Sequence, residues 1–145
     1  MLTIYPAVFY EYKDGRYTVI FPDLNHLATD GANFEDAMAM AIDCLAGYVF
    51  SEKLEGHPLP PPTPFAEFDP HCEDDGDEAE NGIVRTFGNL VSVDVEEYAK
   101  LHFSKPIKKT LSIPEWLNDM AVNRQINFSK TLQKALLNEL GIGKA

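Results

Sequence analysis

The chain has 145 residues, 45% of them hydrophobic, and a net charge of −11. This length suits one ordinary domain or two small ones, and the hydrophobic content excludes global disorder. No apolar run approaches the roughly 20 residues of a membrane helix, and the N-terminus does not resemble a signal peptide. Cys44 and Cys72 are not a close-spaced pair, so we expect neither a disulfide framework nor a zinc site, and a cytoplasmic protein.

The charge is unevenly distributed along the chain. Residues 1–104 hold 5 of the 12 Lys and Arg residues and 20 of the 23 Asp and Glu residues, which gives a net charge of −15. Residues 105–145 hold 7 basic and 3 acidic residues, a net charge of +4. An accidental distribution is one explanation. The other is two modules with different partners, in which the acidic part repels nucleic acid and the basic tail binds it.

The N-terminal residues predict a small antiparallel sheet. Leu2–Tyr12 is rich in β-branched and aromatic residues, Lys13–Gly15 is a turn signal, and Arg16–Leu24 alternates between apolar and polar residues. Together these segments predict a β-hairpin. His26–Gly31 is expected to form a short third strand.

A helix is expected after the third strand. Asn33 is a suitable N-cap, and Glu35 and Asp36 lie in the first turn, where negative charge favours the helix dipole. Gly56 and the proline-rich residues 57–64 end the helix. Apolar residues at helical spacing predict one inward face, made of Phe34, Met38, Ala41, Ile42, Leu45, Tyr48 and Val49.

Residues 57–82 are first proline-rich and then acidic. Asp69–Gly82 contains seven carboxylates and neither Lys nor Arg, which predicts a solvated loop or a disordered insertion. Ile83–Val95 is then expected to form one or two strands. Asp94 and Glu97 fit a capping box that begins a short helix.

The tail predicts a strand followed by two helices. Residues 107–113 alternate in polarity, Pro114 suits the first position of a helix, Asn127 can cap a second helix, and Gly141 can end it. A unit of about 35 residues is too small to bury its own apolar faces, and its single strand has no partner. Two copies solve both problems by forming an antiparallel ribbon and a four-helix core. The expected dimer core is Leu111, Ile113, Leu117, Met120, Phe128, Leu132 and Leu136.

A two-stranded ribbon fits the major groove of B-DNA. Its outward face would present Lys108, Thr110 and Ser112 to base edges. The N-terminus of the second helix would offer N–H groups to a phosphate. The alternatives are a plain exposed strand face and ordinary helix capping. The expected phosphate-contacting residues are Asn127, Phe128, Ser129 and Lys130.

Two parts of the sequence resemble known families. The residues "KKTLSIPEWLNDMAVNRQINFSKTLQKALLNELG" resemble the ribbon-helix-helix family of transcriptional repressors over nearly all of residues 107–141. The stretch "YPAVFYEYKDGRYTVIFPDLNHLATDGANFEDAMAMAIDCLAGYV" resembles the HicB family of antitoxins, through "FPDL" followed by "TDG" and an "EDA" helix start. The segment "VSVDVEEYAKL" is similar to the HicB strand–helix exit, whereas residues 57–82 are less typical of that family.

The resemblance implies an α+β fold in two domains. Residues 1–103 would form a toxin-binding domain, a partial RNase H-like sheet with one main helix and an insertion at 57–82. Residues 104–145 would form a dimeric ribbon-helix-helix (β-α-α) module. The protein would be the antitoxin of a type II toxin–antitoxin system. It would neutralise a HicA-like, mRNA-cleaving toxin by direct binding and repress its own operon as a homodimer, or a higher oligomer, on operator double-stranded DNA.

The acidic charge of the N-terminal part fits such a partner, because a toxin that grips RNA must be positive and is attracted by a negative module. The acidic run is then either a substitute for RNA or a solubilising loop. The candidate toxin-binding residues are Asp23, Asp74, Asp75, Asp77 and Glu78.

Catalysis is not expected. Two-metal phosphoryl chemistry needs carboxylates gathered at one site, and the candidates Asp14, Asp23, Asp30 and Asp36 each have a structural explanation in a turn, a strand end or a helix start. No catalytic motif surrounds any histidine, namely His26, His57, His71 and His102. We expect no metal and no cofactor. The alternatives are a stand-alone repressor with a ligand-sensing N-terminal domain and a metal-dependent nuclease.

Overall fold

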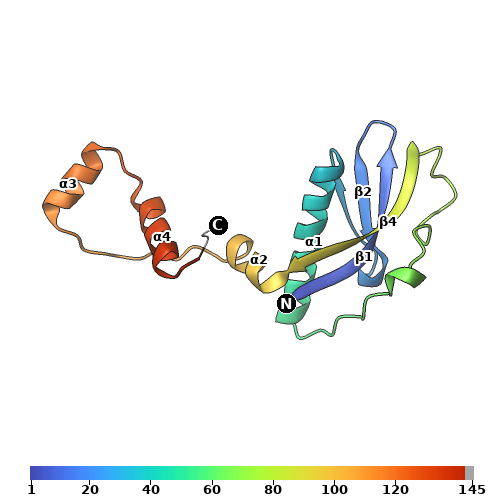
Figure 1. The fold of residues 1–145 in the computed structure, drawn as a ribbon, viewed down its shortest axis with the longest axis horizontal. Coiled ribbons are helices and arrows are strands. Elements are labelled where there is room, and N and C mark those ends of the chain that lie inside the picture. The colour runs from blue at the N-terminus through green and yellow to red at the C-terminus, as the bar shows by residue number, and fades with distance from the viewer. Residues whose placement is uncertain (143–145) are drawn as a thin grey trace. The chain divides into compact units, whose positions relative to one another are not determined.

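A computed structural model describes residues 1–142 and divides the chain into two compact units (Figure 1). Unit 1 comprises residues 1–105, and unit 2 begins at Pro106. None of the helices in the described residues has the length and apolar character needed to cross a bilayer.

Unit 1 is built on a four-stranded antiparallel sheet in the order β3-β2-β1-β4. β1 pairs with β2 so that Val8 lies opposite Ile20, which confirms the predicted hairpin. β4 pairs with nearly the whole of β1, from Leu2 opposite Asp94 to Tyr12 opposite Ile83. The strands are β1 (Leu2–Tyr12), β2 (Tyr17–Phe21), β3 (Leu27–Gly31) and β4 (Ile83–Asp94).

Two strands are shorter than the sequence predicted. β2 ends at Phe21, because Pro22–Leu24 forms a turn of 3₁₀ helix, η1. Pro22 has no N–H to donate to a ladder, which explains the end of the strand there. β3 starts at Leu27 because Asn25 and His26 both have a φ of 59°, which is incompatible with a strand.

Helix α1 (Phe34–Leu54) begins where the sequence predicted. The Asn33 side chain accepts a hydrogen bond from the Asp36 backbone N–H at 2.9 Å. The predicted inward face is confirmed for most of its residues, because Met38, Ile42 and Tyr48 are partly buried against the core. Phe34 is 40% exposed, and its ring centroid lies 5.7 Å from that of Phe9. Small side chains let the helix lie close to the sheet, with longer ones at its margins. The buried residues are Ala37, Ala41, Leu45, Ala46 and Val49.

The main core lies between α1 and one face of the sheet. Alternate residues of β1, namely Tyr5, Ala7 and Phe9, share a buried cluster with the inward residues of α1. Val91 and Val93 of β4 extend this cluster. Helix α2 (Val95–His102) follows β4 directly, and Asp94 caps it by accepting from Glu97 N–H at 3.2 Å, as predicted.

The opposite face of the sheet, here called the outer face, is covered in part by residues 57–82. Pro6 and Val8 are fully buried there although α1 lies on the other side. The segment contains one turn of 3₁₀ helix, η2 (Phe65–Glu67). A Cβ built on Gly88 would lie 3.1 Å from the Phe68 ring. Phe65 and Phe68 of this irregular segment therefore pack on the sheet. Asp69–Gly82, predicted as a solvated loop or a disordered insertion, has no helix or strand and is mostly exposed, which agrees with a solvated loop.

Unit 2 contains helices α3 (Glu115–Asn123) and α4 (Phe128–Glu139). Pro114 lies immediately before α3 instead of at its first position. Asn127 caps α4 by accepting from Lys130 N–H at 3.0 Å, and Gly141 follows its C-cap with a φ of 70°. Residues 107–113, predicted as a strand, carry no strand in the single chain. A strand needs a hydrogen-bonded neighbour, and the prediction placed that neighbour in a second copy.

The packing of α1 on β3 yields a stability prediction. A Cβ on Gly31 would lie 2.2 Å from the backbone nitrogen of Ala37, so Gly31→Ala forces backbone apart and should destabilise unit 1 by about 1–3 kcal/mol. Gly47→Ala is the matched control. Its Cβ would meet only Phe103 Cζ at 3.8 Å, and better helix propensity should stabilise it by up to about 1 kcal/mol.

Urea unfolding followed by far-ultraviolet circular dichroism measures both variants. Equal effects of the two substitutions would contradict the close approach of α1 to β3.

Candidate interaction surfaces

Hydrogen bonds and apolar packing hold residues 57–64 against the body of unit 1. Asp23, in η1, accepts hydrogen bonds from the backbone N–H and the hydroxyl of Thr63, both at 2.7 Å. The Tyr5 hydroxyl donates to the Pro60 carbonyl, and Leu59 packs against the core. Asp23 was predicted as a toxin-binding carboxylate, and the structure gives it an internal role.

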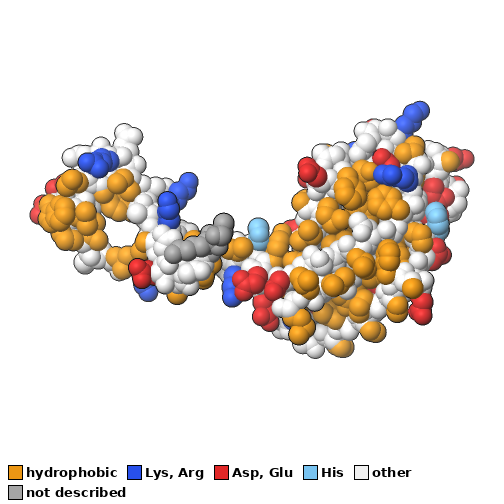
Figure 2. All heavy atoms as spheres, in the orientation of Figure 1, with side chains coloured by type: hydrophobic (Ala, Val, Ile, Leu, Met, Phe, Trp, Pro, Cys, Tyr) orange, Lys and Arg blue, Asp and Glu red, His pale blue; other side chains and the backbone are white. Residues whose placement is uncertain are grey.

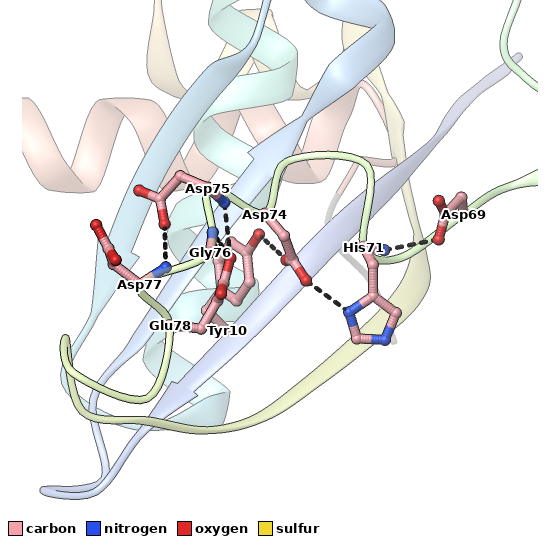
Figure 3. A network of polar contacts seen from close by, with 8 residues as sticks. All are labelled: Tyr10, Asp69, His71, Asp74, Asp75, Gly76, Asp77 and Glu78. Carbon is pink, nitrogen blue, oxygen red and sulfur yellow. Dashed lines mark hydrogen bonds and ion pairs between the residues drawn. The ribbon is translucent and has the colours of Figure 1, made fainter.

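The acidic residues that follow are tied to β1 by a tyrosine (Figure 3). The Tyr10 hydroxyl donates to Asp74 Oδ1 at 2.7 Å, and Asp74 Oδ2 lies 2.9 Å from His71 Nδ1. A second histidine, His26, lies 2.6 Å from Glu73 through its Nδ1. The acidic segment is thus fastened at both Glu73 and Asp74.

The remaining predicted carboxylates shape a local turn in the same network (Figure 3). Glu78 Oε1 accepts from the backbone N–H groups of Asp75 at 2.7 Å and of Gly76 at 3.1 Å. Asp75 Oδ1 accepts from Asp77 N–H at 3.0 Å. Asp74, Asp75, Asp77 and Glu78 therefore lie together, as a turn supported by its own carboxylates.

A shallow pocket of about 220 Å³ lies between this turn and the outer face. The carboxylates of Glu73, Asp75 and Glu78 line it together with the rings of Tyr10 and Tyr12. Carboxylates and aromatic rings both attract a guanidinium or ammonium group. The pocket is smaller than the roughly 300–1,000 Å³ of usual small-molecule sites, so it suits a single basic side chain better than a small ligand.

The Tyr10–Asp74 hydrogen bond changes the pKa of both side chains. The hydrogen bond from Tyr10 is the main cause that lowers the pKa of the Asp74 carboxyl below its usual 3.8, with His71 adding to it. Burial, followed by the hydrogen bond to Asp74, raises the pKa of the Tyr10 phenol. The phenol therefore remains a donor at neutral pH.

The other half of the outer face is open and apolar. Leu2, Ile4 and Leu90 are 60%, 42% and 45% exposed, and Phe65 is 48% exposed. Ile4 and Leu90 are diagonal neighbours, because Leu90 pairs with Pro6 and Ile4 with Ser92. We call Leu2, Ile4, Leu90 and Phe65 the apolar patch. In the space-filling view, hydrophobic side chains cover much of unit 1, with acidic groups around them (Figure 2).

The four carboxylates considered for metal-dependent catalysis are held apart by separate structural contacts. Asp14 pairs with Arg16, Asp30 accepts from the Thr18 hydroxyl, and Asp36 accepts from Ala32 N–H. Asp23 holds Thr63 as described above. In residues 1–142 none of the four belongs to a group of three or more metal-ligating side chains.

The residues predicted to contact DNA lie in unit 2 and are exposed. Lys108, Thr110 and Ser112 belong to the segment without regular structure. At the start of α4, the Ser129 hydroxyl accepts from the Gln133 amide at 2.9 Å, and Phe128 is 45% exposed. Lys130 is also exposed, and its backbone N–H is taken by the Asn127 cap.

The residues predicted to form a dimer core are not buried in the single chain. Neither α3 nor α4 has any buried residue, and Leu132 is half-buried. Helices with unburied apolar faces gain little stability alone. The exposed members of the predicted core are Leu111, Ile113, Leu117, Met120, Phe128 and Leu136.

Sequence reasoning missed the apolar patch and the anchoring of residues 57–82. The aromatic residues Phe65 and Phe68, unusual in a solvated proline-rich stretch, were the available signal for the second feature. No sequence signal distinguishes Ile4 and Leu90 from core residues, because their exposure depends on where residues 57–82 stop covering the sheet.

Comparison with known proteins identifies the family. No protein-family model and no curated protein matches the sequence. Among solved structures, a chain of a toxin–antitoxin complex from Streptococcus pneumoniae is 33% identical, with 96% of this chain and 99% of that chain covered and a TM-score of 0.58. The chain belongs to this toxin–antitoxin family.

Structures named for HicB match as well. A chain of a HicA3 and HicB3 toxin–antitoxin complex is 29% identical, covering 61% of this chain and 94% of that chain, with a TM-score of 0.41. The antitoxin HicB of Burkholderia pseudomallei is 22% identical, covering 98% of this chain and 99% of that chain, with a TM-score of 0.47. The toxin–antitoxin family rests on the pneumococcal match, in agreement with the sequence resemblance.

The fastening of the acidic segment in this toxin–antitoxin protein yields a titration prediction. Because the pKa of Asp74 is lowered in the folded chain, its contacts stabilise the segment above pH 3.8, and this stability is lost as the pH falls through the lowered pKa. Tyr10→Phe removes the main cause, so the pKa of Asp74 should rise toward its usual value.

Carboxyl-carbon NMR titration measures the pKa of Asp74 directly. Tyr12→Phe is the matched control, because the Tyr12 hydroxyl contacts Thr18 Oγ1 instead of a carboxylate. An unchanged pKa of Asp74 in Tyr10→Phe would contradict the role of that hydrogen bond.

Proposed function

We propose that the chain is a HicB-type antitoxin of a type II system, in which unit 1 binds and neutralises a HicA-like, mRNA-cleaving toxin. The observation that carries this proposal is the match, over nearly the whole of both chains, to a component of a toxin–antitoxin complex. The role is that of a binding protein, and the carboxylates once considered for catalysis have structural contacts instead.

The apolar patch is the proposed centre of the toxin-binding surface. Exposed apolar side chains rimmed by polar groups are typical of protein interfaces. Carboxylates bracket the patch at both ends. On one side the acidic turn of Asp74–Glu78 lies over Tyr10. On the other, Leu2 pairs with Asp94, which is followed by the exposed Glu96 and Glu97.

Charge complementarity supports a basic partner for this surface. An RNA-cleaving toxin needs positive charge to grip its substrate, and residues 1–104 carry a net charge of −15. Complementary charge accelerates the association of two proteins, and it disfavours partners whose charge has the same sign. The pocket lined by Glu73, Asp75 and Glu78 offers a place for one Lys or Arg of the toxin.

The tail is the proposed DNA-binding and dimerisation module. The absence of buried residues in α3 and α4 is explained if two copies join, since each then covers the apolar face of the other. Residues 107–113 of the two copies would pair as an antiparallel ribbon with Lys108, Thr110 and Ser112 outward. In this arrangement the protein represses its own operon from operator DNA.

Toxin binding is tested by placing a charge in the apolar patch. Leu90→Asp should weaken binding of the toxin encoded by the neighbouring reading frame by at least about tenfold, because a buried, unpaired carboxylate opposes docking. Met40→Asp, at a residue of α1 that is 42% exposed, is the matched control and should bind normally.

Isothermal titration calorimetry and protection of cells that express the toxin are the two measurements. If Leu90→Asp binds and protects as the parent does, the toxin docks elsewhere on the chain. If no neighbouring gene product binds the parent chain, the antitoxin proposal is wrong.

Operator binding is tested on the ribbon face. Lys108→Ala and Thr110→Ala should each weaken binding to the promoter DNA by about tenfold or more while the chain stays dimeric. Lys134→Ala removes the same charge from an exposed position of α4 and should have a smaller effect, through general electrostatics alone.

Electrophoretic mobility shifts at fixed salt give the affinities, and light scattering gives the oligomeric state. Parent-like binding by both ribbon variants would show that the ribbon face is misassigned.

A further inference from the structure

The end of α1 has a geometry that brings three ligating side chains together. His57 N–H donates to the Glu52 carbonyl at 2.9 Å, and Gly56 N–H donates to the Lys53 carbonyl at 3.2 Å. Gly56 has a φ of 73°. This pair of hydrogen bonds defines a Schellman motif, in which the second residue past the cap folds back over the last turn.

The side chains at this motif are not the usual ones. A hydrophobic contact often joins the two positions that are here Glu52 and His57. Instead, His57 Nδ1 lies 3.3 Å from Glu52 Oε2 and 3.4 Å from Glu55 Oε2. One ligating atom from each of the three residues lies within 4.8 Å of the other two. In residues 1–142 no other group of three or more such side chains is this close.

These spacings match the coordination sphere of a metal ion. Tetrahedral zinc with bonds of about 2.0–2.2 Å places neighbouring ligand atoms about 3.3 Å apart. The distances exceed those of a typical charged hydrogen bond, about 2.7–2.9 Å. The C-terminus of α1 also carries the negative end of the helix dipole, which favours a cation.

We propose that Glu52, Glu55 and His57 form a binding site for a divalent transition-metal ion of the zinc type. Imidazole nitrogen together with carboxylate oxygen suits zinc, whereas magnesium and calcium prefer oxygen ligands alone. Three protein ligands leave a fourth position for water. The side chains of Glu55 and His57 are more than half exposed, so the ion reaches the site directly from solvent.

The site has a structural consequence for unit 1. His57 begins the segment whose Leu59 packs on the core and whose Pro60 carbonyl accepts from Tyr5. A metal ion that joins His57 to the last turn of α1 fixes the start of this segment. Because the ion binds the folded site and not the separated ligands, it raises the stability of the folded chain.

Zinc titration of the full-length, untagged chain, freed of metal with a chelator, tests the proposal. Competition with a chromophoric chelator should give one zinc ion per chain, and magnesium should not compete. His57→Ala and Glu52→Gln should each weaken zinc binding by at least about tenfold. His102→Ala, which removes a histidine stacked on Tyr98 in α2, is the matched control and should bind zinc as the parent does.

Thermal unfolding is a second readout, since zinc should raise the melting temperature of the parent and of His102→Ala but not of His57→Ala. Circular dichroism verifies that each variant is folded before titration. Failure of the parent to bind zinc overturns the proposal, and so does parent-like zinc affinity in His57→Ala. Both results are independent of toxin and DNA binding.

Discussion

The sheet of unit 1 has two faces, and residues 1–105 supply one long helix, α1, to cover them. α1 buries the face that carries Tyr5, Ala7 and Phe9. The outer face is covered by residues 57–82, which have almost no regular structure and so depend on side-chain anchors. This cover reaches Val8 and Tyr10 but leaves Ile4 and Leu90 exposed. The limit of the cover therefore defines the apolar patch on which the proposed toxin-binding surface is centred.

In unit 2, even fewer apolar side chains are covered by the rest of the chain. Its two helices present apolar side chains and bury none of them. In water, helices of 9 and 12 residues are marginal without tertiary packing. Unit 1 covers most of its sheet with its own chain, whereas the proposed cover for the apolar side chains of unit 2 is a second copy. In the proposed arrangement, dimerisation of the tail and its proposed DNA-binding surface form together, since the proposed ribbon requires two copies.

The sequence predicted elements where the signals are local. The KDG turn predicted the β1–β2 hairpin, and the polar caps Asn33, Asp94 and Asn127 predicted three helix starts correctly. The sequence-based prediction failed where contacts between residues far apart in the sequence determine the structure. Composition did not predict the contacts that join residues 57–82 to the sheet, because Phe68 over Gly88 and Tyr10 bonded to Asp74 join positions far apart in the sequence. On α1 the apolar pattern predicted the inward face but did not include Ala37, whose burial beside Gly31 depends on the tertiary packing.

The carboxylates of Asp69–Gly82 both anchor this segment to unit 1 and supply negative charge for the proposed partner. Of its seven carboxylates, five accept hydrogen bonds or contact a histidine within unit 1, namely Asp69, Glu73, Asp74, Asp75 and Glu78. A hydrogen-bonded carboxylate keeps its charge, and the lowered pKa of Asp74 shows that such contacts favour the charged form. The segment therefore holds negative charge in fixed positions instead of spreading it over a mobile loop. Fixed charges lose less conformational entropy when a basic partner binds, so the anchoring that orders the segment also prepares it for the proposed interaction.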